Sequence, residues 1–240
     1  MSDLLATKQR QFNEAMERYE KIPGYKLIGR FVSFTNVSLQ IFLAILVVPQ
    51  SIGLLSQVLT FGLAYVLTDF VNGLVHMYMD NNDDYDSYAG PLIASFHLHH
   101  RTPRYKENPL HIVYYNESGS KLWLVFFLAV SVVAVAKGIV TGAAAYGLLY
   151  FSVLSSVAEV SHYFCHTPQN KLVKFLGNLR ILLNIRYHAQ HHLKDNYSYA
   201  FLNGLSDPLI NRIARKFYAG YKNTTDLHYA RYEGPGTENR

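Results

Sequence analysis

Histidine is the residue type in this chain that points most clearly to chemistry. The sequence has 11 histidines in 240 residues, and all but His228 lie between His76 and His192. Most recur at intervals of three or four residues, so on helices each group shares one face. The groups are His76 with Asp80, His97 with His99 and His100, His162 with His166, and His188 with His191 and His192. Imidazole in such a pattern is typical of a site for iron, zinc, copper or nickel.

The number of candidate ligands bears on the number of ions. A single structural zinc ion closes its site with four ligands. Here eight to ten candidates come from four segments of the chain. We therefore expect two metal ions in one site.

Two acidic residues stand in otherwise uncharged runs and share a helix face with these histidines. Asp69 precedes His76 by seven residues, and Glu159 precedes His162 by three. A carboxylate in such an apolar run is costly and indicates a function. We expect each one to accept the free ring N–H of a ligating imidazole, which would fix the orientation of that ring. The alternative is a structural hydrogen bond between helices.

Composition excludes several classes of protein. Hydrophobic residues make up 50% of the chain, which argues against intrinsic disorder. Cys165 is the one cysteine. An internal disulfide framework and a cysteine-based zinc site are therefore excluded, because both need several thiols.

Long apolar runs with few charges predict the elements that must position the histidines. At about 1.5 Å per residue, each run spans most of a hydrocarbon layer that is about 30 Å thick. The predicted spans are residues 31–48, 52–75, 122–140 and 143–161. The fold expected is an all-α membrane protein, with four transmembrane helices as two hairpins and a histidine-rich helical cap. The alternative is buried helices of a soluble protein.

The positive charges predict which side of the membrane holds the cap. Two hairpins would place 21 of the 22 lysines and arginines on one side, and the positive-inside rule makes that side cytosolic. The membrane is expected to be the endoplasmic reticulum in a eukaryote and the inner membrane in a bacterium. The net charge of +5 then reflects topology, and we expect no nucleic acid as a partner because no binding module accompanies the charge.

The polar segments complete the organisation. The expected parts are a cytosolic N-terminal arm (1–30), a membrane domain (31–221) and a flexible tail (222–240). Within the membrane domain, charges that recur among apolar residues predict an interfacial helix over about 170–189. Ser206 followed by Pro208 predicts the start of a basic helix over about 209–221.

The motifs form a series with a fixed order. It consists of Asp69-x3-Gly73-x2-His76-x3-Asp80, Phe96-x2-His99-His100-x2-Pro103, His111 followed by Asn116, His162-x3-His166, and His188-x2-His191-His192. This series resembles the Kua family of lipid desaturases, over about residues 60–212. An isolated HxxHH motif would be weak evidence, but five motifs in order between apolar runs are strong.

The resemblance implies a membrane di-iron enzyme. The residues that it assigns to the two iron ions are His76, Asp80, His99, His100, His111, His162, His166, His188, His191 and His192. Beside these ligands we expect Asp69, Glu159, His97 and Asn116.

The reaction that the resemblance implies is an O2-dependent desaturation of an alkyl or acyl chain in a membrane phospholipid. Each turnover consumes two external electrons. The chain has no flavin or dinucleotide glycine fingerprint and too few cysteines for an iron–sulfur cluster. A separate donor such as cytochrome b5 or ferredoxin is therefore expected.

Two other functions fit the same residues. One is a di-iron hydroxylase of lipids or fatty acids, because both reactions begin by removing hydrogen from a carbon chain. The more remote one is a histidine-rich metal transporter, whose ligands would lie near the membrane midplane.

Overall fold

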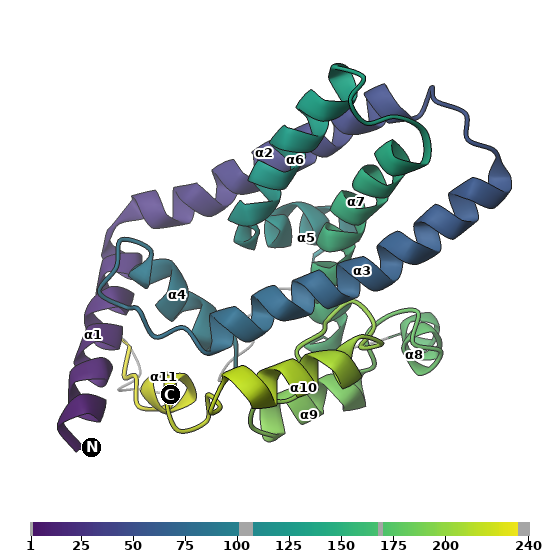
Figure 1. Cartoon of the computed structure of the whole chain (residues 1–240). Coiled ribbons are helices and arrows are strands. Elements are labelled where there is room, and N and C mark those ends of the chain that lie inside the picture. Colours follow the sequence, from purple (N-terminus) through teal and green to yellow (C-terminus); the bar gives the residue numbers. More distant parts are fainter. Residues whose placement is uncertain (1, 101–107, 168–169, 235–240) are drawn as a thin grey trace.

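The computed structural model describes residues 2–100, 108–167 and 170–234, and the regular elements in these ranges are all helices. In chain order they are α1 (Ser2–Lys21), α2 (Pro23–Val47), α3 (Leu54–Asp80), α4 (Gly90–His97), the 3-10 turn η1 (Leu98–His100), α5 (Leu110–Glu117), the 3-10 turn η2 (Ser118–Ser120), α6 (Leu122–Ala136), α7 (Gly142–Cys165), α8 (Lys171–Asn178), α9 (Ile185–Leu193), α10 (Asp207–Phe217) and α11 (Thr225–Ala230). Figure 1 shows α2, α3, α6 and α7 as the long upper part, with α8, α9 and α10 beneath α3.

Three helices, α2, α3 and α7, are long and apolar enough to cross a membrane. The fourth expected span is not confirmed. Its helix, α6, ends at Ala136 rather than at residue 140, because the chain turns there and Gly138 adopts a φ of 69°. A fourth span exists only if α6 and the segment Leu110–Ser120, which meet at 95°, count as one bent element.

All three of these helices are longer than the spans predicted from the sequence, and α7 continues past residue 161 to Cys165. α2 begins at Pro23 rather than at residue 31, since proline fits the first turn of a helix, where no N–H donor is needed. α3 continues past residue 75 to Asp80. It therefore carries Asp69, His76 and Asp80 on one continuous helix, and all three side chains are buried.

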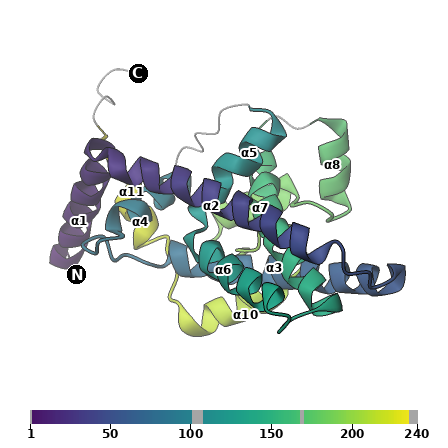
Figure 2. The ribbon, with the colours of Figure 1, turned by 90° about the horizontal axis from the view of Figure 1, so that it is seen from above.

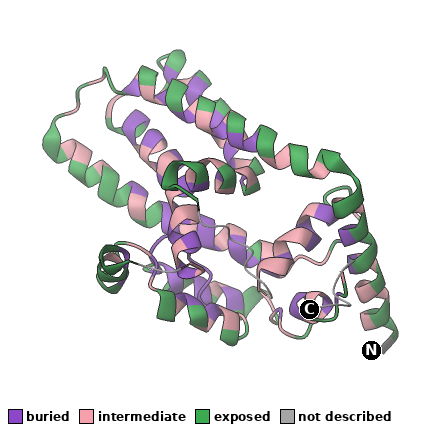
Figure 3. Ribbon diagram, turned by 180° about the vertical axis from the view of Figure 1, so that it is seen from behind, coloured by how far each residue is buried: buried purple, intermediate pink, exposed green. Residues whose placement is uncertain are grey.

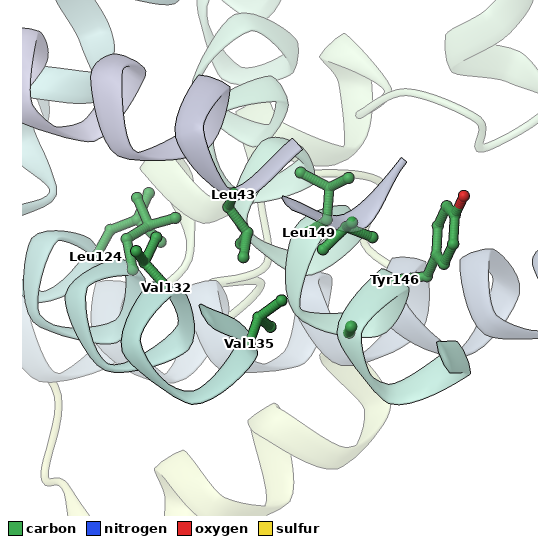
Figure 4. Packing of buried hydrophobic residues seen from close by; sticks show 9 residues of the cluster. Leu43, Leu124, Val132, Val135, Tyr146 and Leu149 are labelled. Atoms are coloured by element: carbon green, nitrogen blue, oxygen red, sulfur yellow. The ribbon is translucent and has the colours of Figure 1, made fainter. Parts of the chain in front are cut away.

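The apolar core of the upper part lies where α2, α6 and α7 meet. Leu43, Leu124, Leu128 and Leu149 pack there, and Figure 4 shows their neighbours on the same helices. The outer faces of α2, α3 and α6 are instead exposed over much of their length (Figure 3) and carry many large apolar side chains. An exposed apolar surface of this extent is unfavourable in water but not in a bilayer.

The N-terminal helix packs on the far end of the molecule from the α6–α7 turn. Phe12 of α1 meets Tyr85 edge to face, with ring centroids 5.1 Å apart, and meets Tyr232 in the same way, with centroids 5.6 Å apart. Figure 2 shows α1 beside α4 and α11. The prediction of a flexible tail over 222–240 is wrong for its first part, because α11 forms there and Asp226 and His228 are buried.

The prediction of one helix over 170–189 is also wrong. The chain forms α8 and α9, separated by a turn in which Arg180 has a φ of 56°. Each helix has its own asparagine cap: Asn170 accepts the N–H of Val173, and Asn184 accepts those of the first turn of α9. The last histidine motif therefore lies on a short helix of its own.

The basic helix predicted after Pro208 is present as α10, although it ends at Phe217. Ser206 precedes it but makes no capping hydrogen bond. Its hydroxyl donates instead to Asp69 of α3. Ser206 was expected to cap the N-terminus of α10. Its hydrogen bond instead attaches this end of α10 to the candidate span α3.

Candidate metal centre

Eight histidines gather into two groups of four. In each group the candidate ligand atoms lie within 4.8 Å of one another. The first group is His76, His99, His100 and His191, and the second is His162, His166, His188 and His192. Helix α9 contributes to both, because positions 191 and 192 point about 100° apart around the helix, on either side of position 188. The two groups are neighbours: the ring centroids of His191 and His192 are 5.3 Å apart.

In the second group the Nε2 atoms approach one another closely. The distances are 3.1 Å between His162 and His166, 2.9 Å between His166 and His188, and 2.9 Å between His188 and His192. Two nitrogen ligands at right angles on one ion, with bonds of about 2.1 Å, lie about 3 Å apart. The spacing of these nitrogens therefore fits ligands of a common ion.

In the first group the ring nitrogens have divided roles. The Nδ1–H groups donate to backbone carbonyls: His76 to Tyr199 (2.9 Å), His99 to Phe96 (2.7 Å) and His191 to Tyr197 (3.0 Å). This arrangement leaves each Nε2 lone pair directed into the group, as in ligating histidines generally. The Nε2 atoms of His76 and His99 are buried and have no hydrogen-bond partner in the described part of the chain.

Asp80 lies at the centre of the first group. Its carboxylate oxygens are 3.4 Å from the Nε2 atoms of His76, His100 and His191. Both oxygens are buried without a hydrogen-bond donor among the described residues. A carboxylate in such a position either ligates a cation or balances its charge, because a buried anion needs a partner. The donor set of the first group, three or four nitrogens and an oxygen, fits iron.

Burial keeps most of these imidazoles neutral, which is the form that binds a metal. It lowers the pKa of His166 to about 4 and that of His192 to about 3. The pKa values of His99, His188 and His191 are also lowered well below the ordinary value, by burial first and by neighbouring histidines second.

His100 behaves differently. Burial disfavours its imidazolium form, but the carboxylates of Asp80 and Asp226 outweigh burial and raise the pKa to about 9. Its Nδ1 lies 3.0 Å from Asp226, which also pairs with Lys222 at 2.7 Å. Sequence reasoning missed Asp226, which falls in the segment predicted to be a tail. Its spacing of four residues from Lys222 was the one available signal, and it indicates only a helical turn.

The comparison with protein families decides which family the chain belongs to. Residues 65–220 match a family model described as a lipid desaturase domain, which is more than half of the chain. The chain belongs to the lipid desaturase family. The resemblance to the Kua family is thereby confirmed, and membership indicates an oxidoreductase-type enzyme of lipid metabolism. No curated protein and no solved structure matches the chain.

Within the lipid desaturase domain, Glu159 lies beside a candidate ligand. Its Oε2 atom is 4.0 Å from Nδ1 of His162, and its Oε1 atom is 3.0 Å from Nζ of Lys121. The Lys121 ammonium also donates to the side-chain carbonyl of Asn72 and lies 4.7 Å from the centre of the Phe201 ring. Sequence reasoning missed Lys121, because nothing in its local sequence distinguishes it from a lysine at a membrane boundary.

The role expected for Asp69 is wrong. In the described part of the lipid desaturase domain, its hydrogen bonds go to the segment 202–206 and not to an imidazole. Oδ1 accepts the backbone N–H groups of Leu202, Asn203 and Gly204, at 3.2, 3.0 and 3.2 Å. The Nδ1–H of His76 is already bonded to the carbonyl of Tyr199. The alternative reading, a structural hydrogen bond, therefore describes Asp69.

Three other predicted residues lie outside the two groups. His111 is exposed on α5, where it lines an apolar pocket with Tyr114 and Val160. Asn116 is exposed, and its carbonyl accepts a hydrogen bond from Ser33 of α2. α5 buries Val113 instead, and neither His111 nor Asn116 belongs to the two histidine groups.

His97 is buried beside the first group without joining it. Its Nε2–H donates to the carbonyl of Met79 at 2.8 Å, and its Nδ1 accepts from the Tyr85 hydroxyl at 3.1 Å. Both nitrogens are thus occupied, which leaves none for a metal. By holding Met79, His97 supports the end of α3 that carries Asp80.

Proposed function

We propose that this lipid desaturase is a di-iron enzyme that uses O2 to introduce a carbon–carbon double bond into an alkyl or acyl chain of a membrane phospholipid. The observation that carries the proposal is the pair of adjacent histidine groups that share helix α9. One iron would be held by His76, His99, His100 and His191 with Asp80, and the other by His162, His166, His188 and His192.

Bound iron would supply an oxidant derived from O2, which an unactivated carbon chain requires. In the overall reaction the chain loses two hydrogens, and O2 is reduced to two waters with two electrons and two protons from outside. The electrons would come from a separate donor such as cytochrome b5 or ferredoxin, because the chain has one cysteine and no flavin fingerprint.

The residues of this chain prepare the site in two ways. The carbonyls of Tyr199, Phe96 and Tyr197 orient the imidazoles before any ion binds. Phenyl rings exclude water: Phe96 and Phe201 lie edge-on to His76, with centroids 5.8 and 5.3 Å away. A dry, apolar approach to the metals suits a hydrocarbon substrate better than a hydrated ion in transit.

The membrane supplies this substrate directly. The exposed apolar faces of α2, α3 and α6 favour an integral membrane protein, and the lysine and arginine distribution favours a cytosolic catalytic face. In this arrangement four spans as two hairpins would hold the lipid chain near the histidines of α3 and α7.

Metal analysis and lipid mass spectrometry test the proposal together. Purified protein should contain about two irons per chain, and a host that expresses it should accumulate one phospholipid class that is lighter by two hydrogens. A gain of one oxygen would favour the hydroxylase, and an unchanged lipidome with altered metal uptake would favour the transporter. One zinc per chain would contradict the di-iron site.

Matched variants separate the metal groups from the remaining histidines. His188→Ala and His162→Ala should lose iron and turnover while the protein stays in the membrane. His111→Ala removes an exposed imidazole outside both groups and should keep both irons. Equal iron loss in all three variants would show that the groups do not hold the metal.

A further inference from the structure

The surface between α8 and the start of α9 is strongly basic. From residue 160 to residue 194 the chain has five lysines and arginines and no aspartate or glutamate. Three of these cations, Lys174, Arg180 and Arg186, line two adjoining pockets that share Asn178 and Asn184. Within the described ranges, none of the three pairs with a carboxylate. The pockets therefore present positive charge that no carboxylate of the described residues neutralises.

Arg180 has a backbone conformation that side chains rarely adopt. Its φ is 56°, and it ends α8: its N–H donates to Gly177, and that of Ile181 donates to Leu176. Glycine usually occupies this left-handed position after a helix, because a Cβ atom is unfavourable there. The chain instead has an arginine, whose guanidinium lies 5.1 Å from the centre of the Tyr187 ring. The backbone conformation at position 180 therefore does not account for an arginine, and a role of its side chain does.

Large apolar side chains on α8 and at its C-cap are close in sequence to residues that line the basic pockets. Leu172, Phe175 and Leu179 are 63%, 59% and 55% exposed. The hydroxyl of Tyr65, on the candidate span α3, lies 2.5 Å from the carbonyl of Ile181 and 3.3 Å from that of Arg180, and Figure 1 shows α8 beneath α3. Cations next to exposed apolar side chains are typical of a surface at the boundary of a bilayer. A ligand at this place would combine an anionic group with a hydrocarbon part.

We propose that Lys174, Arg180 and Arg186 bind the phosphate group of a membrane lipid. The planar guanidinium forms paired hydrogen bonds with phosphate oxygens, and lysine adds a point charge. The proposal rests on the proposed function, since the bound lipid would be the substrate of the desaturase. It adds a defined site for the phosphate, outside the two histidine groups.

The position of the pockets suits such a role. Arg186 lies on α9, two residues before His188, so the two side chains point to different sides of the same helix. Thr167, which lines the same pocket as Lys174, follows His166 directly. The phosphate site is therefore attached to the second histidine group through α9 and the end of α7. A phosphate fixed on one side of α9 would limit which carbons of its chain reach the other side.

Binding of two lipids that differ only in the phosphate tests the site. The purified full chain in maltoside micelles is titrated with dioleoyl phosphatidic acid and with dioleoylglycerol. We expect at least tenfold tighter binding of phosphatidic acid, and the variant K174Q/R180Q/R186Q should lose that difference. Equal binding of both lipids by the natural chain would overturn the proposal. Equal affinity for inorganic phosphate would overturn the assignment to a lipid.

A charge-matched control separates this site from general attraction between a basic protein and an anionic lipid. The variant R212Q/R215Q/K216Q removes three exposed cations from α10 and should keep the preference for phosphatidic acid within twofold. An equal loss in both triple variants would overturn the proposal, because it would show that only net charge matters.

Arg180→Gly separates binding from folding. Glycine relieves the left-handed backbone, so the unfolding temperature should stay the same or rise, while the preference for phosphatidic acid should fall at least threefold. Unchanged binding would remove Arg180 from the site. These measurements need no iron. His188→Ala, which should lose iron, should still prefer phosphatidic acid, so a failure of the phosphate site and a failure of the di-iron site give different results.

Discussion

Asp69 accepts two hydrogen bonds from Ser206 at one oxygen, Oδ2: the backbone N–H at 2.9 Å and the hydroxyl at 2.7 Å. Its other oxygen accepts three further N–H groups from the same turn. This carboxylate thus attaches the segment before α10 to the middle of α3. The segment also supplies the Tyr199 carbonyl that orients His76, so Asp69 is connected to the first histidine group through the backbone.

Asp69→Asn should destabilise the protein by about 3 kcal/mol, because the amide offers one acceptor atom where the turn presents donors to both oxygens. Thermal unfolding in detergent measures the loss. Iron content should fall less than stability does, since His76 itself is unchanged. Asp83→Asn, at a partly exposed carboxylate near Lys8, is the control and should shift stability by less than 1 kcal/mol. If Asp69→Asn unfolded at the same temperature as the natural protein, the hydrogen bonds of Asp69 would not hold this turn to α3.

Lys121 and Glu159 form a buried ion pair whose side chains are 4% and 12% exposed. Lys121→Met should cost about 3 kcal/mol, because it leaves the carboxylate without its cation. The double variant Lys121→Met, Glu159→Gln should recover most of that loss, since neither charge then remains. Unfolding free energies of the four proteins in the cycle measure the coupling.

The same cycle has a metal readout. Glu159 lies near Nδ1 of His162, so Glu159→Gln should weaken the second metal group by about tenfold, even in the stable double variant. Lys137→Met, at an exposed lysine of the α6–α7 turn, should change neither stability nor metal affinity. Additive single effects in the cycle would show that Lys121 and Glu159 act independently.

The metal-free protein should be most stable near pH 6.5. Because burial lowers the pKa of His166 to about 4 and of His192 to about 3, the unfolded chain binds more protons than the folded chain below pH 6.5. Stability therefore falls as the pH is lowered from about 6.5 towards these values. The effect of His100 has the opposite sign. Because its pKa is raised to about 9, its contribution to stability is full below about pH 6.5 and is lost as the pH rises through 9.

Thermal unfolding of metal-stripped protein at pH 4.5, 6.5 and 9.5 checks this dependence. His192→Gln should reduce the loss of stability between pH 6.5 and 4.5 and leave the loss between pH 6.5 and 9.5 unchanged. Asp226→Asn should reduce the loss between pH 6.5 and 9.5, since this carboxylate helps to raise the pKa of His100. A stability that is the same at all three pH values would contradict the prediction.

Gly73 marks the contact between α3 and the segment that precedes α10. A Cβ atom at Gly73 would lie 2.5 Å from Cδ1 of Ile210 and 3.1 Å from Cα of Ala200. Gly73→Ala should therefore cost about 1 to 3 kcal/mol. Gly62→Ala on the same helix is the control, because nothing lies within 4 Å of its Cβ position, and it should be neutral or slightly stabilising. Equal unfolding temperatures for the two variants would contradict the close approach.

Local sequence patterns predicted the parts of this protein that depend on helical periodicity. The apolar runs indicated α2, α3 and α7, and the spacing of His162 and His166 indicated that both would lie on one face. Such patterns report which residues share an element. They also indicated that the histidines would converge, because all the groups were predicted at one face of the membrane.

Contacts between distant segments were not predictable in this way. Asp226 meets His100 from 126 residues away, and no local pattern distinguishes it from a carboxylate of a solvated tail. For Asp69, periodicity gave the correct face of α3, but the donors that occupy this face come from a turn 133 to 137 residues later. His111 has the right residue type in the right order, but it is exposed on α5 and lies outside both groups.

Helix α9 has nine residues and supplies histidines to both groups. The two ions would therefore not be taken up independently. An ion in one group restrains α9, and the conformational entropy that this ordering costs is then already spent when the second ion arrives. Metal loading should accordingly be cooperative, so that at half-saturation the half-loaded protein is less abundant than two independent sites would give.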